Sequence, residues 1–335
     1  METGEEAGGA LRFEVEAGAP RDRLDKLVVH LLERAGHAAS RATVQRWIDE
    51  GRVLVNGAPA RASTAVAPGA RVEVRPAAPP PSSAAPDARV TVPIVFEDPH
   101  LIVIDKPAGL VVHPARGHAA GTLVNGLLAL PGFERASADP RDPAGHLRPG
   151  IVHRLDKGTS GLLVVAKDAA TREALKERFA RHAIEREYVA IVVGEARDAT
   201  HDTLHGRHPT DRLRFTSRVR EGRRAVTHVR VLERLGALAT LVACSLETGR
   251  THQIRVHLAE RGGTPILGDP LYGKPPRHPE LRAAAEEIGR QALHARVLGF
   301  VHPATQAPVR WESPLPADMA RALARLRQLV TRPST

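Results

Sequence analysis

Apolar side chains near the N-terminus recur at helical spacing. They occupy positions i, i+3, i+4, i+7 and i+8, which are Leu24, Leu27, Val28, Leu31 and Leu32. This spacing predicts an amphipathic helix, with Asp22 as its N-cap and Gly36 as its end. A separate short strand is expected over residues 11–15.

A second helix and a hairpin are expected next. Ser40 is a favourable N-cap, and Gly51 ends the pattern of this helix. Its buried face is expected to carry Val44, Trp47 and Ile48. Beyond it, residues 53–55 and 72–74 predict strands, and the Asn-Gly pair at 56–57 predicts a tight turn.

A proline-rich segment divides the chain. Residues 76–91 contain repeated prolines among Ser and Ala, a composition typical of a semi-rigid extended spacer. We therefore expect a mobile tail over residues 1–20, a compact module over 21–75 and a larger domain over 92–330.

Short apolar runs alternate with turns in the larger domain. Strands are expected at 102–104, 162–165, 189–193, 226–232 and 241–246, and helices at 171–182 and 316–329. This mixture predicts an α+β fold with a mixed, largely antiparallel sheet. Residues 131–150, rich in Pro, Gly, Asp and Arg, predict a surface insertion.

Charge and cysteine content narrow the class of protein. The chain has 48 Lys and Arg against 38 Asp and Glu, a net charge of +10, which favours nucleic acid as partner and is also compatible with an anionic membrane surface. The single cysteine, Cys244, excludes a disulfide framework and a cysteine-rich zinc site. No apolar run reaches the length of about 18 residues that a membrane span needs, so we expect a soluble, cytoplasmic protein.

The most unusual string is Ile-Val-His-Arg-Leu-Asp-Lys-Gly-Thr-Ser-Gly at 151–161. It leads into an expected core strand, and such a loop is a rigid mount for a reactive side chain. Asp156 lies between Arg154 and Lys157, whose charges favour an ionised carboxylate that can act as nucleophile, base or ligand. Taken alone, the default interpretation of Asp156 is a structural partner of Arg154.

Other catalytic motifs do not fit. The His-Arg-Leu-Asp string lacks the spacing and the companion loops of a kinase, and residues 158–161 lack the spacing of a nucleophile elbow. Neither a Walker A loop nor a dinucleotide fingerprint occurs. The 17 histidines include no His-Glu-x-x-His pattern, and His252 and His257 are five positions apart, so we expect no metal site.

The order helix, helix, hairpin over residues 22–75, with Ser-Arg opening the second helix and Val-Asn-Gly in the turn, resembles the S4 RNA-binding domain. Arg41, Arg46 and Arg52 belong to or follow the second helix, and guanidinium groups can hold phosphates in bidentate fashion. We therefore expect these arginines to contact RNA; the alternative is an ordinary solvated basic face.

Several further strings occur in order between residues 92 and 320. They are Asp-Lys-Pro-Ala-Gly-Leu at 105–110 with His-Pro at 113–114, His-Arg-Leu-Asp at 153–156, Arg-Glu-Tyr at 186–188, Gly-Arg-Thr-His-Gln-Ile-Arg-Val-His at 249–257, Gly-Asp-Pro-Leu-Tyr-Gly at 268–273 and Leu-His-Ala at 293–295. Together they resemble the RluA-type pseudouridine synthases. The resemblance implies a catalytic domain with a central cleft.

The resemblance also implies roles for individual residues. Asp156 would be the nucleophile or base on the target nucleotide, and Arg255 would fix its orientation and its ionised form. Tyr188 would pack against the flipped uracil, and Arg154 would help to displace the target base. The residues expected to line the pocket are Ile254 and Leu271.

The resemblance implies an RNA pseudouridine synthase, acting on 23S large-subunit ribosomal RNA or an immature large subunit. The reaction breaks the N1–C1′ bond of uridine and rejoins the base through C5, so it requires no redox cofactor, and the uracil anion leaves without a metal. The strings at 206–210 and 225–228 resemble the branch that modifies ribosomal helix 69. A tRNA-specific synthase and a non-catalytic RNA-binding assembly factor are the alternatives, and we expect a monomer.

Overall fold

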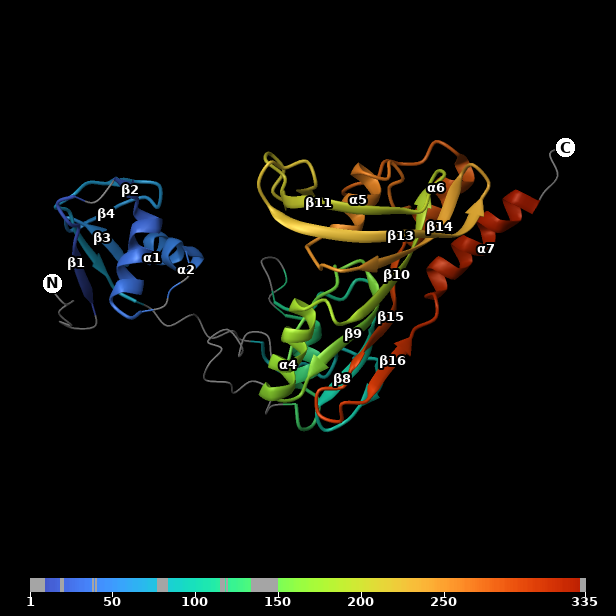
Figure 1. Cartoon of the computed structure of the whole chain (residues 1–335), viewed down its shortest axis with the longest axis horizontal. Coiled ribbons are helices and arrows are strands. Elements are labelled where there is room, and N and C mark those ends of the chain that lie inside the picture. Colours follow the sequence, from blue (N-terminus) through green and yellow to red (C-terminus); the bar gives the residue numbers. More distant parts are fainter. Residues whose placement is uncertain are drawn as a thin grey trace. The chain divides into compact units, whose positions relative to one another are not determined.

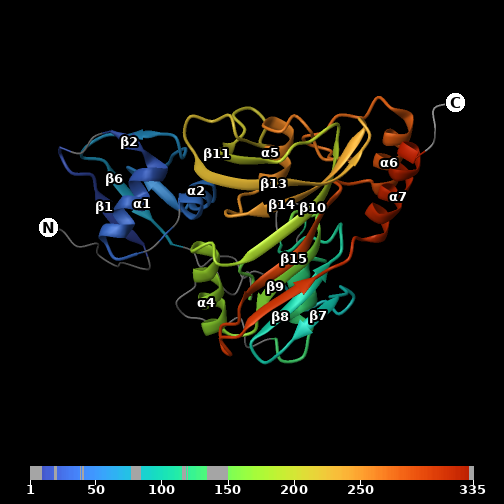
Figure 2. The same ribbon diagram turned by 45° about the vertical axis from the view of Figure 1, so that its right-hand side comes forward.

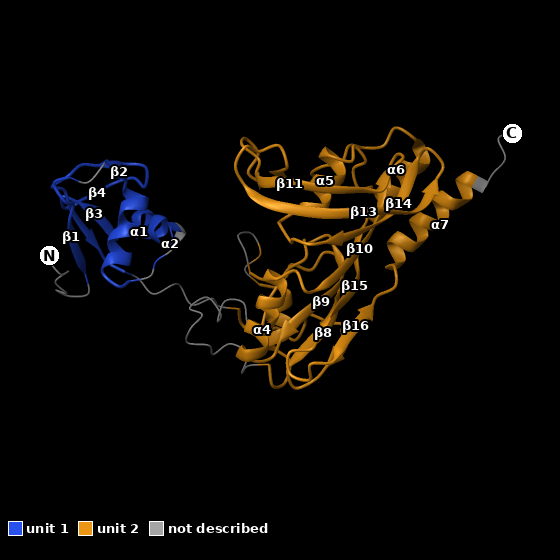
Figure 3. Ribbon diagram, in the orientation of Figure 1, with its two compact units in different colours: residues 1–82 blue, residues 83–335 orange. Residues whose placement is uncertain are grey.

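The computed structural model (Figure 1) describes residues 10–18, 21–37, 39, 41–76, 84–114, 118, 120–133 and 150–331. The chain divides into two compact units, residues 1–82 and 83–335 (Figure 3). Ser40, most of the expected tail, the core of the proline-rich spacer and residues 134–149 of the expected insertion lie outside the described residues.

Two helices pack on a small antiparallel sheet in the first unit. The helices are α1 (Leu24–Arg34) and α2 (Arg41–Asp49), and the strands are β1 (Leu11–Glu14), β2 (Asp22–Arg23), β3 (Val53–Val55), β4 (Ala58–Pro59), β5 (Ala65–Val66) and β6 (Arg71–Val74). The main sheet has the order β1-β6-β3-β4, and β2 pairs separately with β5. Its core contains Leu24, Val28 and Leu32 from α1 with Val44, Trp47 and Ile48 from α2, which are the faces that the apolar spacing predicts.

One local expectation in this unit is wrong. Asp22 does not cap α1: it lies in β2 opposite Val66, the N-cap position belongs to Arg23, and no side chain bonds there. Asp22, which was expected to cap the helix, is therefore part of a strand pair instead. The tight turn expected at 56–57 is confirmed: it connects β3 to β4, and the expected strand at 72–74 is part of β6, which pairs with the other edge of β3.

A mixed sheet organises the second unit. In the described residues it has ten strands, in the order β12-β11-β13-β14-β10-β15-β9-β8-β7, with β16 also paired to β15. Its strands are β7 (Ile94–Glu97), β8 (Leu101–Lys106), β9 (Ser160–Ala166), β10 (Glu185–Val193), β11 (Ala199–Arg207), β12 (Phe215–Thr216), β13 (Arg223–Leu235), β14 (Ala239–Leu246), β15 (Leu293–Val301) and β16 (Pro308–Glu312). Every pairing is antiparallel except that of β15 with β9, so the expected α+β fold is confirmed.

Helices cover parts of this sheet. They are α3 (Leu123–Leu128), α4 (Ala169–Ala180), α5 (Gln253–Glu260), α6 (Pro279–Ile288) and α7 (Ala317–Thr331). Both views place α4 along β9, α5 beside β13, and α6 next to α7 (Figures 1 and 2). The helix expected at 171–182 begins two residues earlier, because the Asp168 carboxylate caps it by accepting a hydrogen bond from the Thr171 amide (2.7 Å). None of the helices in the described part of the chain is long and apolar enough to cross a membrane.

Strands β8 and β9 are buried on both faces. Ile102, Ile104, Leu163 and Val165 join one apolar cluster, whereas their sequence neighbours Leu101, Val103, Leu162 and Val164 join another. Because successive side chains point to opposite faces of a strand, a strand covered on both sides reads as a continuous apolar run. Ser160, the first residue of β9, is therefore a rigid support for the loop that precedes the strand.

Candidate active site

A cavity of about 520 Å³ opens in the second unit. Its volume is typical of sites for small molecules or single nucleotides. Its walls are the loop before β9, the start of β10, and the segment from the end of β14 into α5. Five of the residues singled out in the sequence line it together: Arg154, Asp156, Tyr188, Ile254 and Arg255. Leu271 is not among the lining residues; its backbone amide donates to Asp269 Oδ1 (2.9 Å) behind the cavity wall.

The loop that carries Asp156 is tied down through its backbone. Leu155 is buried in the core, and the Thr159 amide donates to the Asp156 carbonyl oxygen (3.0 Å). The Lys157 carbonyl accepts from the Gly109 amide (2.8 Å), and the Gly158 carbonyl accepts from Arg290 Nη1 (2.9 Å). The carboxylate is therefore presented by a loop whose course is set by three separate segments.

Lys106 holds the same loop from β8. Its side chain is fully buried, and its Nζ donates to the carbonyl oxygens of Pro107 (2.8 Å), Leu110 (2.9 Å) and Lys157 (3.3 Å). Burial, followed by the charge of Arg290, lowers the pKa of Lys106 to about 7. Sequence reasoning gave Lys106 and Arg290 no role; for Lys106 a signal existed, a lysine at the end of an apolar run expected to be a core strand.

Asp156 pairs with Arg255. Arg255 Nη1 donates to Asp156 Oδ2 (3.1 Å), and the Asp156 side chain retains 17 % exposure toward the cavity. Arg154, the sequence neighbour, is an exposed residue at the rim. The default interpretation that Asp156 is a structural partner of Arg154 is therefore wrong for this geometry. Arg255 itself lies on α5 and is buried.

A second carboxylate fixes Arg255 from behind. Asp269 is fully buried and accepts two parallel hydrogen bonds, from Arg255 Nε (2.7 Å) and Nη2 (2.8 Å). Burial acts to lower the pKa of Arg255, but the hydrogen bonds and charges of Asp269 and Asp156 outweigh it and raise the pKa above its usual value. The guanidinium is thus permanently charged, with Nη1 facing Asp156. Sequence reasoning missed Asp269, although the string at 268–273 contains it.

Tyr188 forms a buried wall of the cavity. It lies on β10, where the pairing with β15 shifts register between Glu187 and Tyr188. Such a bulge re-aims a side chain and is frequent beside active sites. Burial raises the pKa of Tyr188, so its phenol stays neutral near pH 7. The position offers an aromatic ring to a planar ligand rather than an ionised oxygen.

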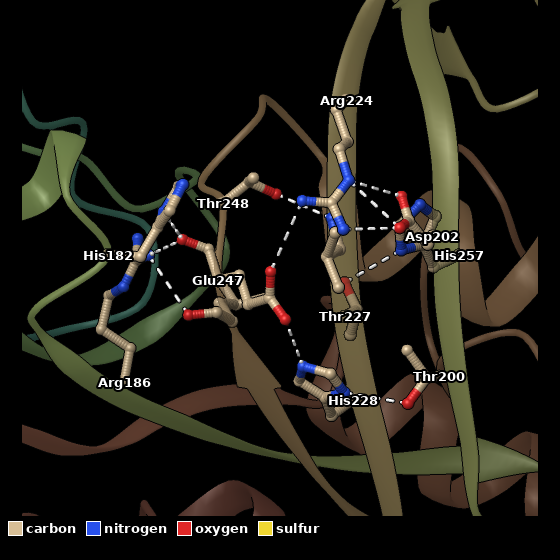
Figure 4. A network of polar contacts seen from close by, with 12 residues as sticks. His182, Arg186, Thr200, Asp202, Arg224, Thr227, His228, Glu247, Thr248 and His257 are labelled. Carbon is tan, nitrogen blue, oxygen red and sulfur yellow. Dashed lines mark hydrogen bonds and ion pairs between the residues drawn. The ribbon is translucent and has the colours of Figure 1, made fainter.

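A polar network fixes the cavity rim between β14 and α5 (Figure 4). The Glu247 carboxylate contacts His228 Nε2 (2.9 Å) and Arg224 Nη1 (3.8 Å), and its backbone oxygen accepts from Arg186 Nη2 (3.0 Å). Arg224 also pairs with Asp202 (2.6 Å) on β11. The rim is therefore held from β10, β11 and β13 at once, and it carries several cations next to the cavity.

The arginines expected to bind RNA in the first unit lie on α2 and just after it. Arg41 Nη2 pairs with Oδ2 of the fully buried Asp25 (2.8 Å). Arg46 and Arg52 both approach Glu50, at 3.6 Å and 3.0 Å. The structure thus groups the three cations on one short segment and gives each a carboxylate partner.

Both units match the models of known protein families. Residues 100–260 match the family model of RNA pseudouridylate synthase, and residues 22–72 match that of the S4 domain. The chain is 44% identical over 310 residues to the RNA pseudouridine synthase YlyB of Bacillus subtilis, covering 92% of this chain and 95% of that protein. It is 43% identical over 297 residues to ribosomal large subunit pseudouridine synthase D of Xanthomonas campestris, covering 86% and 85%. Among solved structures it resembles human RNA Pseudouridylate Synthase Domain Containing 4, with 28% identity, a TM-score of 0.52 and coverage of 70% and 93%.

Proposed function

Because the chain belongs to the RNA pseudouridylate synthase family and carries an S4 domain, we propose that it converts uridine to pseudouridine in large-subunit ribosomal RNA, with Asp156 as the reactive carboxylate. The observation that carries the proposal is the Arg255–Asp156 pair (3.1 Å) in a cavity that Tyr188 also lines. An ionised carboxylate, a fixed cation and an aromatic wall are what breaking and remaking a glycosidic bond to a planar base requires.

The chemistry centres on the N1–C1′ bond. When it breaks, the electron pair passes to the uracil, and C1′ becomes electron-poor. Asp156 then attacks C1′, or takes a proton from C2′, and both routes need the carboxylate in its ionised form. Arg255 Nη1 orients the carboxylate, and because Asp269 holds the other two nitrogens of Arg255, this guanidinium cannot turn away.

The released base rotates against Tyr188, and its C5 bonds to C1′. In the first route this displaces the Asp156 carboxylate from C1′, and in the second the proton that Asp156 took returns to C2′. C5 then loses its proton to solvent, and N1 takes one up.

The target nucleotide must leave its stack to reach this cavity. Unstacking a base costs a few kcal/mol, which contacts to the opened RNA offset. Arg154 lies exposed at the mouth of the cavity and supplies a cation there. Ile254, also in the lining, offers an apolar surface to the base. Arg41, Arg46 and Arg52 supply further phosphate contacts from the S4 unit.

The RNA target is proposed from the relatives. Several at 41–43% identity over most of this chain are named ribosomal large subunit pseudouridine synthase D. The strings at 206–210 and 225–228 resemble the branch of the family that modifies ribosomal helix 69, so we propose that the modified uridines lie in helix 69. Mapping pseudouridine in ribosomal RNA from a strain lacking the protein tests this target. Loss of helix 69 modification supports it, and unchanged helix 69 uridines exclude it.

Release of tritium from C5-labelled uridine tests the catalytic assignment. On a large-subunit transcript we expect Asp156→Asn to lower the rate by about 10³-fold or more, since a side-chain amide is neither a nucleophile nor a base. RNA affinity should stay within about threefold, because phosphate contacts dominate it. Glu195→Gln, which changes an exposed carboxylate in the same unit, is the matched control.

Two outcomes would contradict the assignment. Full activity of Asp156→Asn would remove Asp156 from the reaction. Equal losses of binding and turnover would make it a binding residue. Tritium release from transfer RNA alone would leave the chemistry intact and move the target to transfer RNA.

A further inference from the structure

His252 has an unusual backbone conformation next to the reactive carboxylate. It precedes α5 with a φ of 59° and a ψ of 17°, in the left-handed region that residues with a Cβ atom rarely adopt. Its side chain is 16 % exposed and lines the cavity. Conformations of this kind persist where the surrounding structure holds them, and they concentrate at functional sites.

Hydrogen bonding to Tyr272 favours one of the two imidazole tautomers of His252. The Phe215 amide donates to the Tyr272 hydroxyl oxygen (2.8 Å), and the same oxygen lies 2.9 Å from His252 Nδ1. A hydroxyl has one proton to donate, and burial raises the pKa of Tyr272 to about 12, so this proton is retained. The arrangement that uses every group has the hydroxyl donating to Nδ1, which leaves the hydrogen of His252 on Nε2.

The Nε2–H group has no hydrogen-bond acceptor within the described residues. Asp156 Oδ2 lies 3.9 Å away, too far for a hydrogen bond, and already accepts from Arg255. Burial, with the charges of Arg255 and Arg154, lowers the pKa of His252 against the opposing effect of Asp156 and Asp269. The imidazole is therefore neutral near pH 7 and offers one donor to the cavity, beside the carboxylate.

We propose that His252 is a further catalytic residue of this enzyme, whose Nε2–H donates a hydrogen bond to a carbonyl oxygen of the target uracil. Tyr272 is its positioning residue, because its hydroxyl sets the tautomer. The proposal rests on the proposed function in that the occupant of the cavity is a uridine. A uracil carbonyl fits because it is an acceptor without charge in the ground state, so binding it next to Asp156 brings no second anion.

The contact would strengthen as the reaction proceeds. When the N1–C1′ bond breaks, the electron pair enters the uracil ring and is shared by its two carbonyl oxygens. A donor already in place stabilises this developing charge without reorganisation, and removing one such donor typically lowers kcat about 10²-fold to 10³-fold. A neutral imidazole suits the role because it donates without giving up its proton to the base.

Replacement of His252 by glycine separates the catalytic role from a structural one. His252→Gly relieves the left-handed strain, so the thermal midpoint should stay equal or rise, whereas the single-turnover rate of tritium release should fall about 10²-fold. The matched control is Gln306→Gly, which relieves a φ of 58° in a turn between β15 and β16 and should leave the rate unchanged. His252→Asn, which also tolerates this conformation, provides a second variant should the glycine variant fail to fold.

Sulfur substitution in the RNA identifies the contact. Sulfur is a weaker acceptor than oxygen, so 2-thiouridine or 4-thiouridine at the target should change the rate of the wild type and of His252→Gly by different factors at the contacted position. Tyr272→Phe keeps the ring over Arg255 (5.1 Å) and removes the hydroxyl. It should lower the rate about 10-fold, and the double variant should be no slower than His252→Gly alone.

The outcomes separate this proposal from the proposed function. The RNA used is whichever one the wild type converts, so a wrong choice of ribosomal target does not affect the comparison. Wild-type rates in His252→Gly, identical sulfur effects in both proteins at both positions, or fully additive losses in the double variant would each overturn the role of His252.

Discussion

Asp269 is the residue on which the geometry of the site depends. Its Oδ1 accepts from Arg255 Nη2 and from the amides of Leu271 (2.9 Å) and Tyr272 (3.1 Å), while Oδ2 accepts from Arg255 Nε. With both oxygens engaged and the side chain fully buried, Asp269 has one orientation. Because Asp269 binds two of its nitrogens, Arg255 also has one orientation, and its Nη1 positions the Asp156 carboxylate. The Asp156 carboxylate is thus positioned by a residue that is not among those lining the cavity.

Loss of Asp269 should therefore affect both folding and turnover. Asp269→Ala leaves a buried guanidinium with one partner fewer, a change that costs about 3–5 kcal/mol in buried pairs. We expect a lower urea midpoint and a tritium-release rate reduced at least about 10-fold. The control is Glu233→Gln, which breaks a surface pair with Arg327 and should cost at most about 1 kcal/mol. Wild-type turnover in Asp269→Ala would mean that Arg255 does not need this support.

Among the elements, the parallel pair β9–β15 determines where the loop that carries Asp156 ends. Gly161 pairs with Ala295 of β15 at a φ of 112°, and a Cβ atom there would lie 2.2 Å from the Ala295 carbonyl oxygen. Neither strand can move away, because β9 is also paired to β8 and β15 to β10. The close approach of two backbones at Gly161, the second residue of β9, requires glycine.

Gly161→Ala should accordingly destabilise the second unit by about 3 kcal/mol or more, from the clash and the backbone conformation together. Gly263→Ala shares a positive φ (65°) but meets nothing within 4 Å, so it should cost only about 1 kcal/mol. Urea unfolding of both variants measures the difference. Equal losses would show that conformation alone, without the contact to β15, accounts for the glycine.

At the scale of the whole molecule, the chain has two independent cores. The apolar cluster of the first unit draws only on residues between Leu11 and Val74. The two clusters of the second unit draw only on residues from Val92 onward. Each unit therefore buries its own apolar surface, so we expect the second unit to fold after the first is removed.

Deletion of residues 1–75 should weaken RNA binding and flatten its dependence on salt. Removing one phosphate-binding cation reduces the slope of log affinity against log salt by about 1, so removal of Arg41, Arg46 and Arg52 should reduce it by about 3. Binding titrations between about 50 mM and 200 mM salt measure this slope. The triple Gln variant of these arginines is the second test, and its thermal midpoint is measured alongside because Arg41 also pairs with the buried Asp25. An unchanged slope would show that the S4 unit does not hold RNA phosphates.

Local patterns were sufficient for the elements whose burial follows from their own sequence. The α1 and α2 faces and strands β8 and β9 were predictable because their apolar residues alone define the buried side. β15 and α5 were not predicted. Their buried positions include His294 on β15, and Gln253, Arg255 and His257 on α5. A polar residue is buried only where a distant partner satisfies it, so periodicity cannot reveal such an element.

The residues of the candidate site also fall into two groups, those chosen from the sequence and those found only in the folded structure. The sequence by itself determined the two-domain organisation, the family resemblance and the choice of Asp156, Tyr188 and Arg255, because these depend on residue types in ordered strings. The resemblance implied that Arg255 acts on Asp156, and the tertiary structure shows these two residues, 99 positions apart, joined at 3.1 Å, with no hydrogen bond or ion pair in the described residues between Asp156 and the nearer Arg154. It alone brought in Asp269, Lys106 and His252. Pairing between charges depends on distance in space and on burial, and the folded chain sets both.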